Sequence, residues 1–121
     1  MYMMEGCIIN HAIEFIETPI FEAQRKSLID DEEYRAFQND VIKNPEFGEL
    51  IVGTGGLRKA RLAPKDRGKS SGFRVIYLLV LPDTVHLILM YKKGQKDSLT
   101  AKEKNQLKEV ALSIKGEYRN D

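Results

Sequence analysis

The sequence predicts an α+β domain in which helices pack on an antiparallel sheet, with its elements in the order β-α-α-β-β-β-α. Apolar residues recur at helical spacing in residues 19–43 and again after residue 100, whereas residues 57–92 form short segments typical of strands. The Pro82-Asp83 link between the last two of these segments is too short for a crossover helix. These segments must therefore form a hairpin, which makes that part of the sheet antiparallel.

The length and composition suit a single domain. The chain has 121 residues, of which 42% are hydrophobic, enough for one compact unit with a modest core. It contains no run of about 18 apolar residues that could span a membrane, and its start lacks the pattern of a secretory signal. We expect one domain over residues 12–117, a flexible extension over residues 1–11, no membrane contact and a cytoplasmic location.

The first half predicts one strand and two short helices. Residues 12–17 alternate apolar and acidic side chains, the period of a strand with one buried face. The Thr18-Pro19 pair then starts a helix that ends near Leu28, because threonine caps helix starts and proline fits the first turn. A second helix covers about residues 30–43, with a solvated acidic start, and Asn44-Pro45 ends it.

The second half predicts three strands and a final helix. A glycine-rich loop at residues 53–56 precedes strands at residues 57–63, 72–81 and 84–92, and a T-x-x-E capping box at residues 100–103 starts the helix. The middle strand is apolar on both faces, as a central strand would be. The loop is not a nucleotide-binding loop, because no GK[ST] follows it and it leads into a strand instead of a helix.

Charge is divided between the two halves of the chain. Residues 1–50 have a net charge of −7, whereas residues 51–121 have a net charge of +8. Residues 57–74, LRKARLAPKDRGKSSGFR, hold seven Lys or Arg and one Asp. Such a run can be a solvated face or loop, or it can indicate a polyanionic partner.

The expected strand pairing favours a polyanionic partner over a solvated loop. If the last hairpin is centred on the Asp of its Pro-Asp turn, Arg74 lies beside Lys92, with Lys93 close by. The preceding hairpin brings Arg61 across from the Arg74 region, with Lys59 on the same face. Mutual repulsion makes such a cluster unfavourable unless an anion compensates it, so we predict a phosphate-binding site. The four converging cations are Lys59, Arg61, Arg74 and Lys93.

Other site chemistries find no support in the sequence. The single Cys7 cannot form an internal disulfide, and one Cys with two distant His residues makes no metal cluster. His86 lies roughly 23 Å along its strand from Lys93, so we expect a structural or exposed histidine there. Neither a Ser-His-Asp set nor paired carboxylates appear among the basic strands. We therefore predict no metal and no cofactor.

Three strings carry a resemblance: NPEFGELIVGTGGLRKARLA at residues 44–63, GKSSGFRVIYLLV at residues 68–80 and KDSLTAKEKNQL at residues 96–107. Together they resemble the RelE/HigB family of bacterial toxins, and most closely its HigB-type members. The resemblance covers roughly residues 12–115. It implies a microbial RNase-like fold, a bacterial toxin–antitoxin operon and cleavage of messenger RNA in the A site of the 70S ribosome. It also implies a HigA-like antitoxin with a helix-turn-helix domain, through which alone the toxin reaches operator DNA.

The resemblance also implies a chemistry. In this metal-independent reaction the RNA 2′-OH attacks the adjacent phosphate and leaves a cyclic phosphate and a 5′-OH end. Lys59 and Arg61 match the pair of basic positions of the family, and Arg74 matches its phosphate-stabilising arginine. Lys59, crowded by other cations, is a candidate for base or acid. This chain departs from the family near its C-terminal site segment, so the general acid stays open between Lys93, Lys96, Tyr91 and the ribosome itself.

The remaining basic residues and one tyrosine are candidates for contacts with RNA or the ribosome. The loop cations among them are expected either to grip ribosomal RNA or to move freely. Two other functions stay open: a ParE-like toxin that poisons DNA gyrase without cutting RNA, and a nucleic-acid-binding module without catalysis. The candidates for RNA or ribosome contacts are Arg58, Lys65, Arg67, Lys69, Tyr91, Lys92 and Lys96.

Overall fold

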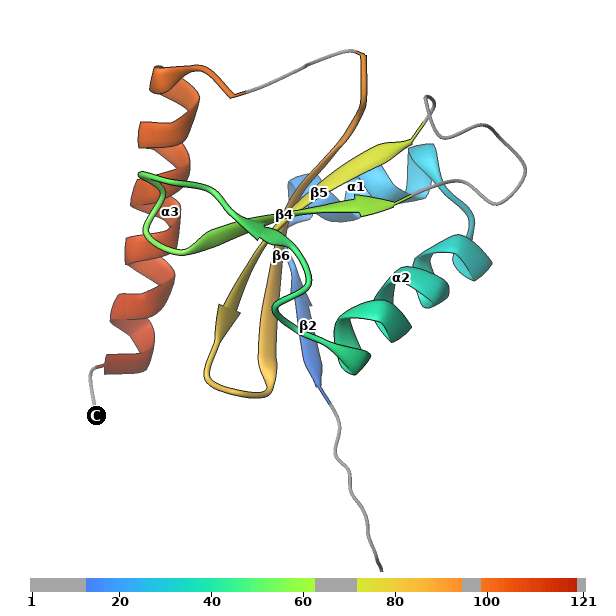
Figure 1. Ribbon diagram of the computed structural model, residues 1–121, viewed down its shortest axis with the longest axis horizontal. Helices are drawn as coiled ribbons and strands as arrows, with labels where there is room; N and C mark the ends of the chain where they lie inside the picture. The colour runs from blue at the N-terminus through green and yellow to red at the C-terminus, as the bar shows by residue number, and fades with distance from the viewer. Residues whose placement is uncertain (1–12, 63–71, 95–98, 120–121) are drawn as a thin grey trace, which may run out of the picture.

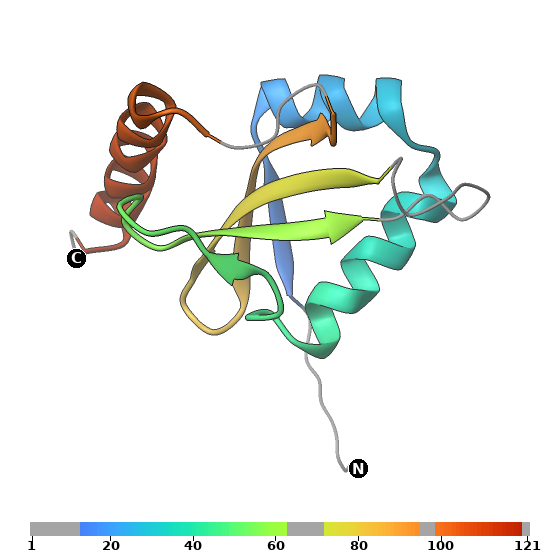
Figure 2. The same ribbon diagram turned by 45° about the horizontal axis from the view of Figure 1, so that its top comes forward.

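The computed structural model describes residues 13–62, 72–94 and 99–119 (Figure 1). Within these residues a five-stranded sheet has the strand order β2-β6-β5-β4-β3. The helices lie on both sides of it, with α3 apart from α1 and α2 (Figure 2). The elements are β2 (Glu14–Glu17), α1 (Pro19–Leu28), α2 (Asp31–Lys43), β3 (Glu49–Leu50), β4 (Leu57–Leu62), β5 (Phe73–Val80), β6 (Thr84–Lys92) and α3 (Ala101–Arg119).

The predicted α+β class and element order are confirmed, and β5 is the central strand as its sequence indicates. Its alternate side chains Val75 and Tyr77 belong to one buried cluster, and Ile76 and Leu78 belong to another on the opposite face. The strand is apolar on both faces because helices cover both. The strand predicted over residues 72–81 was one residue too long at each end, and the first strand begins at Glu14. Residues 12 and 63, the outer ends of two other predicted strands, lie outside the described residues.

Two features of the sheet differ from the sequence-based expectation. The two-residue strand β3 was not predicted, and it pairs antiparallel with β4 through Glu49 and Leu50. The first strand, β2, pairs with β6 in parallel, so the sheet is mixed instead of purely antiparallel. Sequence periodicity identifies a strand but does not identify its neighbour, and here the neighbour is the last strand of the chain.

Side-chain caps define the helix starts as predicted. Thr18 Oγ1 accepts a hydrogen bond from the Phe21 N–H at 3.0 Å, with Pro19 at the first helical position. Asp30 and Glu33 form a reciprocal capping box at the start of α2. Such a capping box provides hydrogen-bond acceptors for backbone N–H groups that would otherwise lack partners at the start of a helix. A second box, at Thr100 and Glu103, starts α3.

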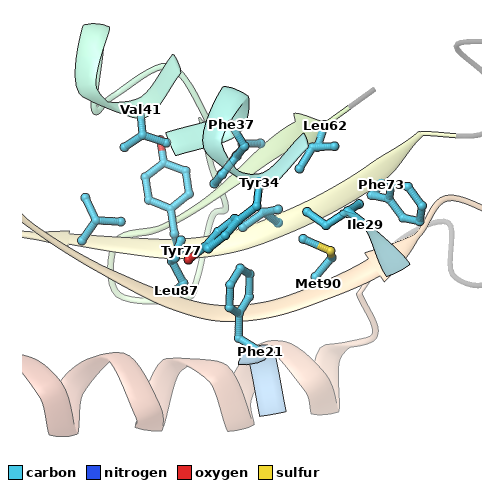
Figure 3. Packing of buried hydrophobic residues seen from close by; sticks show 13 residues of the cluster. Phe21, Ile29, Tyr34, Phe37, Val41, Leu62, Phe73, Tyr77, Leu87 and Met90 are labelled. Atoms are coloured by element: carbon cyan, nitrogen blue, oxygen red, sulfur yellow. The ribbon is translucent and has the colours of Figure 1, made fainter. Parts of the chain in front are cut away.

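Helices α1 and α2 cover one face of the sheet. Phe21 of α1 and Phe37 and Val41 of α2 are buried against that face, where Tyr77 of β5 lies (Figure 3). Burying each such side chain contributes about 1.5–3 kcal/mol to folding. This cluster fixes both helices on the sheet.

A polar contact fastens the edge strand β2 to the same helices. The Tyr34 hydroxyl donates a hydrogen bond to Glu17 Oε2, and Arg25 Nε donates to the same oxygen at 3.1 Å. The Arg25 guanidinium also lies 4.3 Å from the centre of the Tyr34 ring. Burial, followed by the hydrogen bond to Glu17, raises the pKa of Tyr34. One carboxylate therefore joins β2, α1 and α2.

Helix α3 covers part of the opposite face. Leu107 and Ala111 lie in a buried cluster with Ile76 and Leu78 of β5. Arg74, near the beginning of β5, is half-buried. No helix among the described residues has the length and apolar character needed to cross a membrane.

Candidate functional site

Strands β4 and β5 bring three cations to one face of the sheet. Arg61 lies directly opposite Arg74 in the antiparallel pair, as the sequence predicted. Lys59 and Arg61 alternate with Ala60 and Leu62, which are buried in the cluster under α1 and α2. Neighbouring positions on a strand face opposite sides, so Lys59, Arg61 and Arg74 share the face that α3 covers in part.

The predicted partner of Arg74 on β6 was wrong by one residue. Arg74 lies opposite Tyr91, and Lys92 lies opposite Phe73. The hairpin is centred on Pro82 instead of the following Asp, and β6 contains an irregularity that shifts the register halfway along the pair. A one-residue shift exchanges the two faces, so Tyr91 and not Lys92 shares the face of Arg74.

Lys93 lies at the same end of the sheet, since its N–H donates to the carbonyl oxygen of Gly72 at 3.0 Å. Its side chain is exposed and does not line the hollow around Arg74. The expected flexible extension, residues 1–11, lies outside the described residues. The candidates Lys65, Arg67, Lys69 and Lys96 also lie outside the described residues.

A hollow of about 300 Å³, which we call the cation cavity, lies among these strands. It is at the low end of the range for small-molecule sites, about 300–1,000 Å³, and so has room for one compact group. Guanidinium and ammonium groups on its wall favour an anion such as a phosphate. Its lining residues are Phe47, Glu49, Lys59, Ala60, Arg61 and Arg74.

Glu49 is the residue of this cavity that sequence reasoning missed. It lies directly opposite Lys59 in the β3–β4 pair, and among the described residues no ion pair joins the two side chains. A carboxylate in this place adds a proton acceptor to a group of cations. The available signal was the glycine-rich turn, because a hairpin centred on Thr54 pairs residue 49 with residue 59.

The turn between β3 and β4 needs glycine. Gly53, Gly55 and Gly56 have φ values of 82°, 76° and 109°, a region that other residues rarely adopt. Lys115 of α3 donates a hydrogen bond from Nζ to the carbonyl oxygen of Gly55, and Thr54 Oγ1 donates to Ile51 O at 2.6 Å. The predicted flexible connection is thus a defined turn that helix α3 holds in place.

Arg58 points away from the cation cavity and holds the segment that leads into β3. Its Nη1 donates hydrogen bonds to the carbonyl oxygens of Glu46, at 3.0 Å, and Gly48, at 2.7 Å. The Tyr77 hydroxyl accepts from the Gly48 N–H at 3.0 Å and donates to Pro45 O at 2.7 Å, and burial raises the pKa of this hydroxyl. Arg58 and Tyr77 therefore fix the chain next to Glu49.

Arg61 also lines a separate hollow of about 350 Å³, which lies between β4 and α2 and which we call the α2 hollow. Its acidic wall is formed by Glu32, Glu33 and Asp40 of α2. The cation cavity therefore has an acidic boundary on one side, where a negatively charged strand would be repelled.

His86 has a structural environment, as the sequence indicated. It is buried, its Nε2 lies 2.9 Å from the Tyr118 hydroxyl, and the two rings meet edge to face. Burial lowers the pKa of this imidazole. Within residues 13–62, 72–94 and 99–119, no group of three or more His, Cys, Asp or Glu side chains is placed to hold a metal ion.

Comparison with known families identifies the family of this chain. A family model described as the RelE toxin of the RelE/RelB toxin-antitoxin system matches residues 15–120. The match covers far more than half of the chain and includes every described element from β2 onward except the first residue of β2. The chain therefore belongs to the RelE family of toxins from toxin–antitoxin systems.

Proposed function

We propose that this RelE-family toxin is a ribosome-dependent endoribonuclease that cleaves messenger RNA in the A site without a metal ion. Membership of the toxin family supports the general role. The observation that carries the enzymatic part is the arrangement of Lys59, Arg61 and Arg74 around one small hollow. Cations gathered around a space for one compact anion suit a phosphodiester under attack.

The reaction makes three demands on the site. A base must take the proton of the 2′-OH, cations must stabilise the phosphorane, and an acid must protonate the leaving 5′ oxygen. The products are a 2′,3′-cyclic phosphate and a 5′-OH end. Each demand matches a side chain at or beside the cation cavity.

Arg74 and Arg61 stabilise the phosphorane in this proposal. Guanidinium groups stay protonated at any physiological pH and can bind two phosphate oxygens at once. The two arginines lie directly opposite each other on β4 and β5, so a phosphate between them can contact both. The hydrogen bond from Arg74 Nη1 to its neighbour's carbonyl, Phe73 O, is long at 3.3 Å and leaves other donors of the guanidinium for a ligand.

The base is Glu49 or Lys59, which face each other across the β3–β4 pair. A carboxylate accepts a proton without a prior change in its ionisation, whereas a lysine must first be neutral. Glu49 is therefore the better base, with Lys59 nearby to bind a phosphate oxygen. Tyr91, opposite Arg74, is the better placed acid, and Lys93 is the alternative.

The need for a ribosome follows from the size of the site. A hollow of about 300 Å³ holds one phosphate group and has few walls with which to orient a long flexible strand. The attack of the 2′-OH on the phosphate needs a fixed geometry of the reacting atoms. Because the toxin has too few contacts to impose that geometry, another molecule must hold the messenger. The A site of the ribosome supplies a messenger in a defined conformation.

The partners follow the same proposal. The family implies an antitoxin partner. We propose that this antitoxin is HigA-like, with a helix-turn-helix domain that binds operator DNA, and that the toxin is of the HigB type. The toxin would act in the bacterial cytoplasm, on ribosomes.

The test is cleavage of a defined messenger on purified ribosomes, mapped by primer extension. Wild-type protein is expected to give codon-linked cuts with 5′-OH ends, with and without a chelator. Arg74→Ala is expected to reduce cleavage by about 10²- to 10³-fold. Arg35→Ala, which removes an exposed cation of α2 outside the cavity, serves as the matched control.

Two outcomes contradict the proposal. Cuts that persist unchanged in Arg74→Ala remove Arg74 from the site. An absence of cuts, together with growth arrest and gyrase-linked DNA breaks after expression, favours the ParE-like alternative.

A further inference from the structure

A second hollow adjoins the cation cavity. Its volume is about 240 Å³, and it lies between the β3 edge of the sheet and the start of α3. Glu49 and Lys59 line both hollows, so these two residues form a common wall. The residues that line the second hollow are Glu49, Leu50, Ile51, Val52, Lys59, Leu99 and Lys104.

One side of this hollow is apolar and unusually exposed. Leu50, in the edge strand β3, is 60% exposed, and Val52, in the turn that follows it, is 85% exposed, although both are large aliphatic residues. Proteins commonly protect such edges with charge or cover, so an exposed aliphatic pair indicates a surface that meets a partner. Leu99, which precedes α3, faces them from across the hollow.

The other side carries ammonium groups. Lys104 lies in the first turn of α3, and Lys59 lies on β4 at the boundary with the cation cavity. Among the described residues, no ion pair ties either lysine to a carboxylate. Both charges are thus available to an anion that enters the hollow.

A nucleotide combines the two properties that these walls require. Its base has two apolar faces, and its phosphate carries the charge that a lysine binds. The hollow is too small for more than one such unit. Its common wall with the cation cavity fits a nucleotide that is joined covalently to the phosphodiester bound there.

We propose that this second hollow is a subsite for the nucleotide next to the cleaved phosphodiester, an inference that rests on the proposed ribonuclease function. The base packs on Leu50, Val52 and Leu99, and Lys104 binds the phosphate on its far side. The subsite thus adds a contact with RNA on the α3 side of the reacting group. It also makes the start of α3 part of the RNA-binding surface.

The test measures binding without turnover. The probe is a dinucleotide with a phosphate at each end, so that the phosphate on the far side of the subsite is present. Its first nucleoside has a 2′-deoxyribose, which lacks the attacking hydroxyl, so the probe cannot be cleaved. Protein with labelled Leu and Val methyl groups is titrated with this probe in NMR experiments. The expected result is a saturable shift of the Val52, Leu50 and Leu99 methyl signals, with Leu112, on a distant part of α3, unchanged.

Variants identify the contribution of the lysine. Lys104→Ala is expected to weaken binding of the dinucleotide roughly two- to five-fold, the range for an exposed charged contact. Lys102→Ala, which removes an exposed cation of the same turn that does not line the hollow, is expected to leave the affinity unchanged. Shifts confined to the cation cavity, no binding at millimolar probe, or equal effects of the two variants overturn the inference.

A parallel assay keeps the two proposals apart. Wild-type protein from the same preparation is tested for messenger cleavage on ribosomes. Cleavage without methyl shifts at Val52 and Leu99 overturns the subsite and leaves the ribonuclease function standing. Methyl shifts without cleavage support a nucleotide site and overturn the catalytic proposal.

Discussion

Glu49 lies directly opposite Lys59 in the β3–β4 pair, and both side chains line the cation cavity. One carboxylate therefore stands beside three cations at the point where a phosphodiester is proposed to bind. The two residues can divide the chemistry, because the carboxylate accepts a proton and the ammonium group binds an oxygen of the phosphate.

The division of roles predicts that Glu49→Gln loses activity while the protein stays folded. Removing a general base is expected to lower the cleavage rate by about 10²- to 10⁴-fold. The measurement is single-turnover cleavage of messenger on ribosomes, with thermal unfolding as the check on folding. Glu46→Gln, an exposed carboxylate three residues earlier, is the matched control and should retain wild-type rates. Equal rates for Glu49→Gln and wild type would assign the base to Lys59.

The second prediction concerns the acid. Tyr91→Phe keeps the ring, which packs beside the cluster under α3, and removes the phenolic proton opposite Arg74. Cleavage is expected to fall by about 10²-fold or more, because the leaving oxygen loses its proton donor. A substrate with a 5′-thio leaving group needs no such proton and should restore the rate of the variant. If Lys93→Ala loses more activity than Tyr91→Phe, the lysine is the acid.

The third prediction concerns stability at high pH. The folded-state pKa of Tyr34 is raised, so its contribution to stability is complete below its ordinary pKa of 10.0 and is lost as pH rises above that value. The free energy of unfolding, measured with urea between pH 7 and pH 11, should fall more steeply in wild type than in Tyr34→Phe. At pH 7 the variant should be less stable by about 1–3 kcal/mol, because Glu17 loses a hydrogen bond. The pKa of Tyr77 is also raised, so the free energy of unfolding of both proteins should still fall to some extent at alkaline pH.

The fourth prediction concerns the support of β3. A Cβ atom at Gly48 would lie 2.9 Å from Tyr77 Cε1 and 3.2 Å from the carbonyl oxygen of Lys59, both closer than ordinary contacts. Gly48→Ala is therefore expected to destabilise the fold by about 1–3 kcal/mol and to displace Glu49. Thermal unfolding and cleavage should both decline. Gly116→Ala, inside α3 where a Cβ meets nothing within 4 Å, should leave activity unchanged and should stabilise the fold by about 0.5–1 kcal/mol, because alanine favours a helix more than glycine does.

Local signals in the sequence predicted the helices well. The caps at Thr18, Asp30 and Thr100 act within three residues of themselves, so their meaning does not depend on the rest of the fold. The pairing of Arg61 with Arg74 was also predictable. The strands β4 and β5 follow each other in the sequence, and cationic and apolar side chains alternate clearly along β4.

The remaining parts of the site depend on features that leave little trace in the sequence. The hairpin is centred on Pro82, which alone would place residue 90 opposite Arg74, and the register shift in the apolar run LILM of β6 then places Tyr91 there. Neither the centre of the turn nor an extra residue in an apolar run changes a visible pattern, and so Lys92 was predicted in the place of Tyr91. Strand β3 has two residues and no periodicity at all, which hid Glu49. The first error concerns a neighbour across the sheet, and the second concerns a strand that is too short to be predicted.

The carbonyl oxygens of Glu46 and Gly48 hold the Arg58 guanidinium, and this has a consequence for how RNA binding responds to salt. Binding of a nucleic acid releases one counter-ion for roughly each phosphate that a cation neutralises. Arg58, whose Nη1 donates to these two carbonyls, is directed to the far face of the sheet and is not placed to contact a phosphate in the cation cavity. The count of seven basic residues in the 57–74 segment therefore overstates the number of phosphate contacts at the cavity, to which Lys59, Arg61 and Arg74 contribute and Arg58 does not.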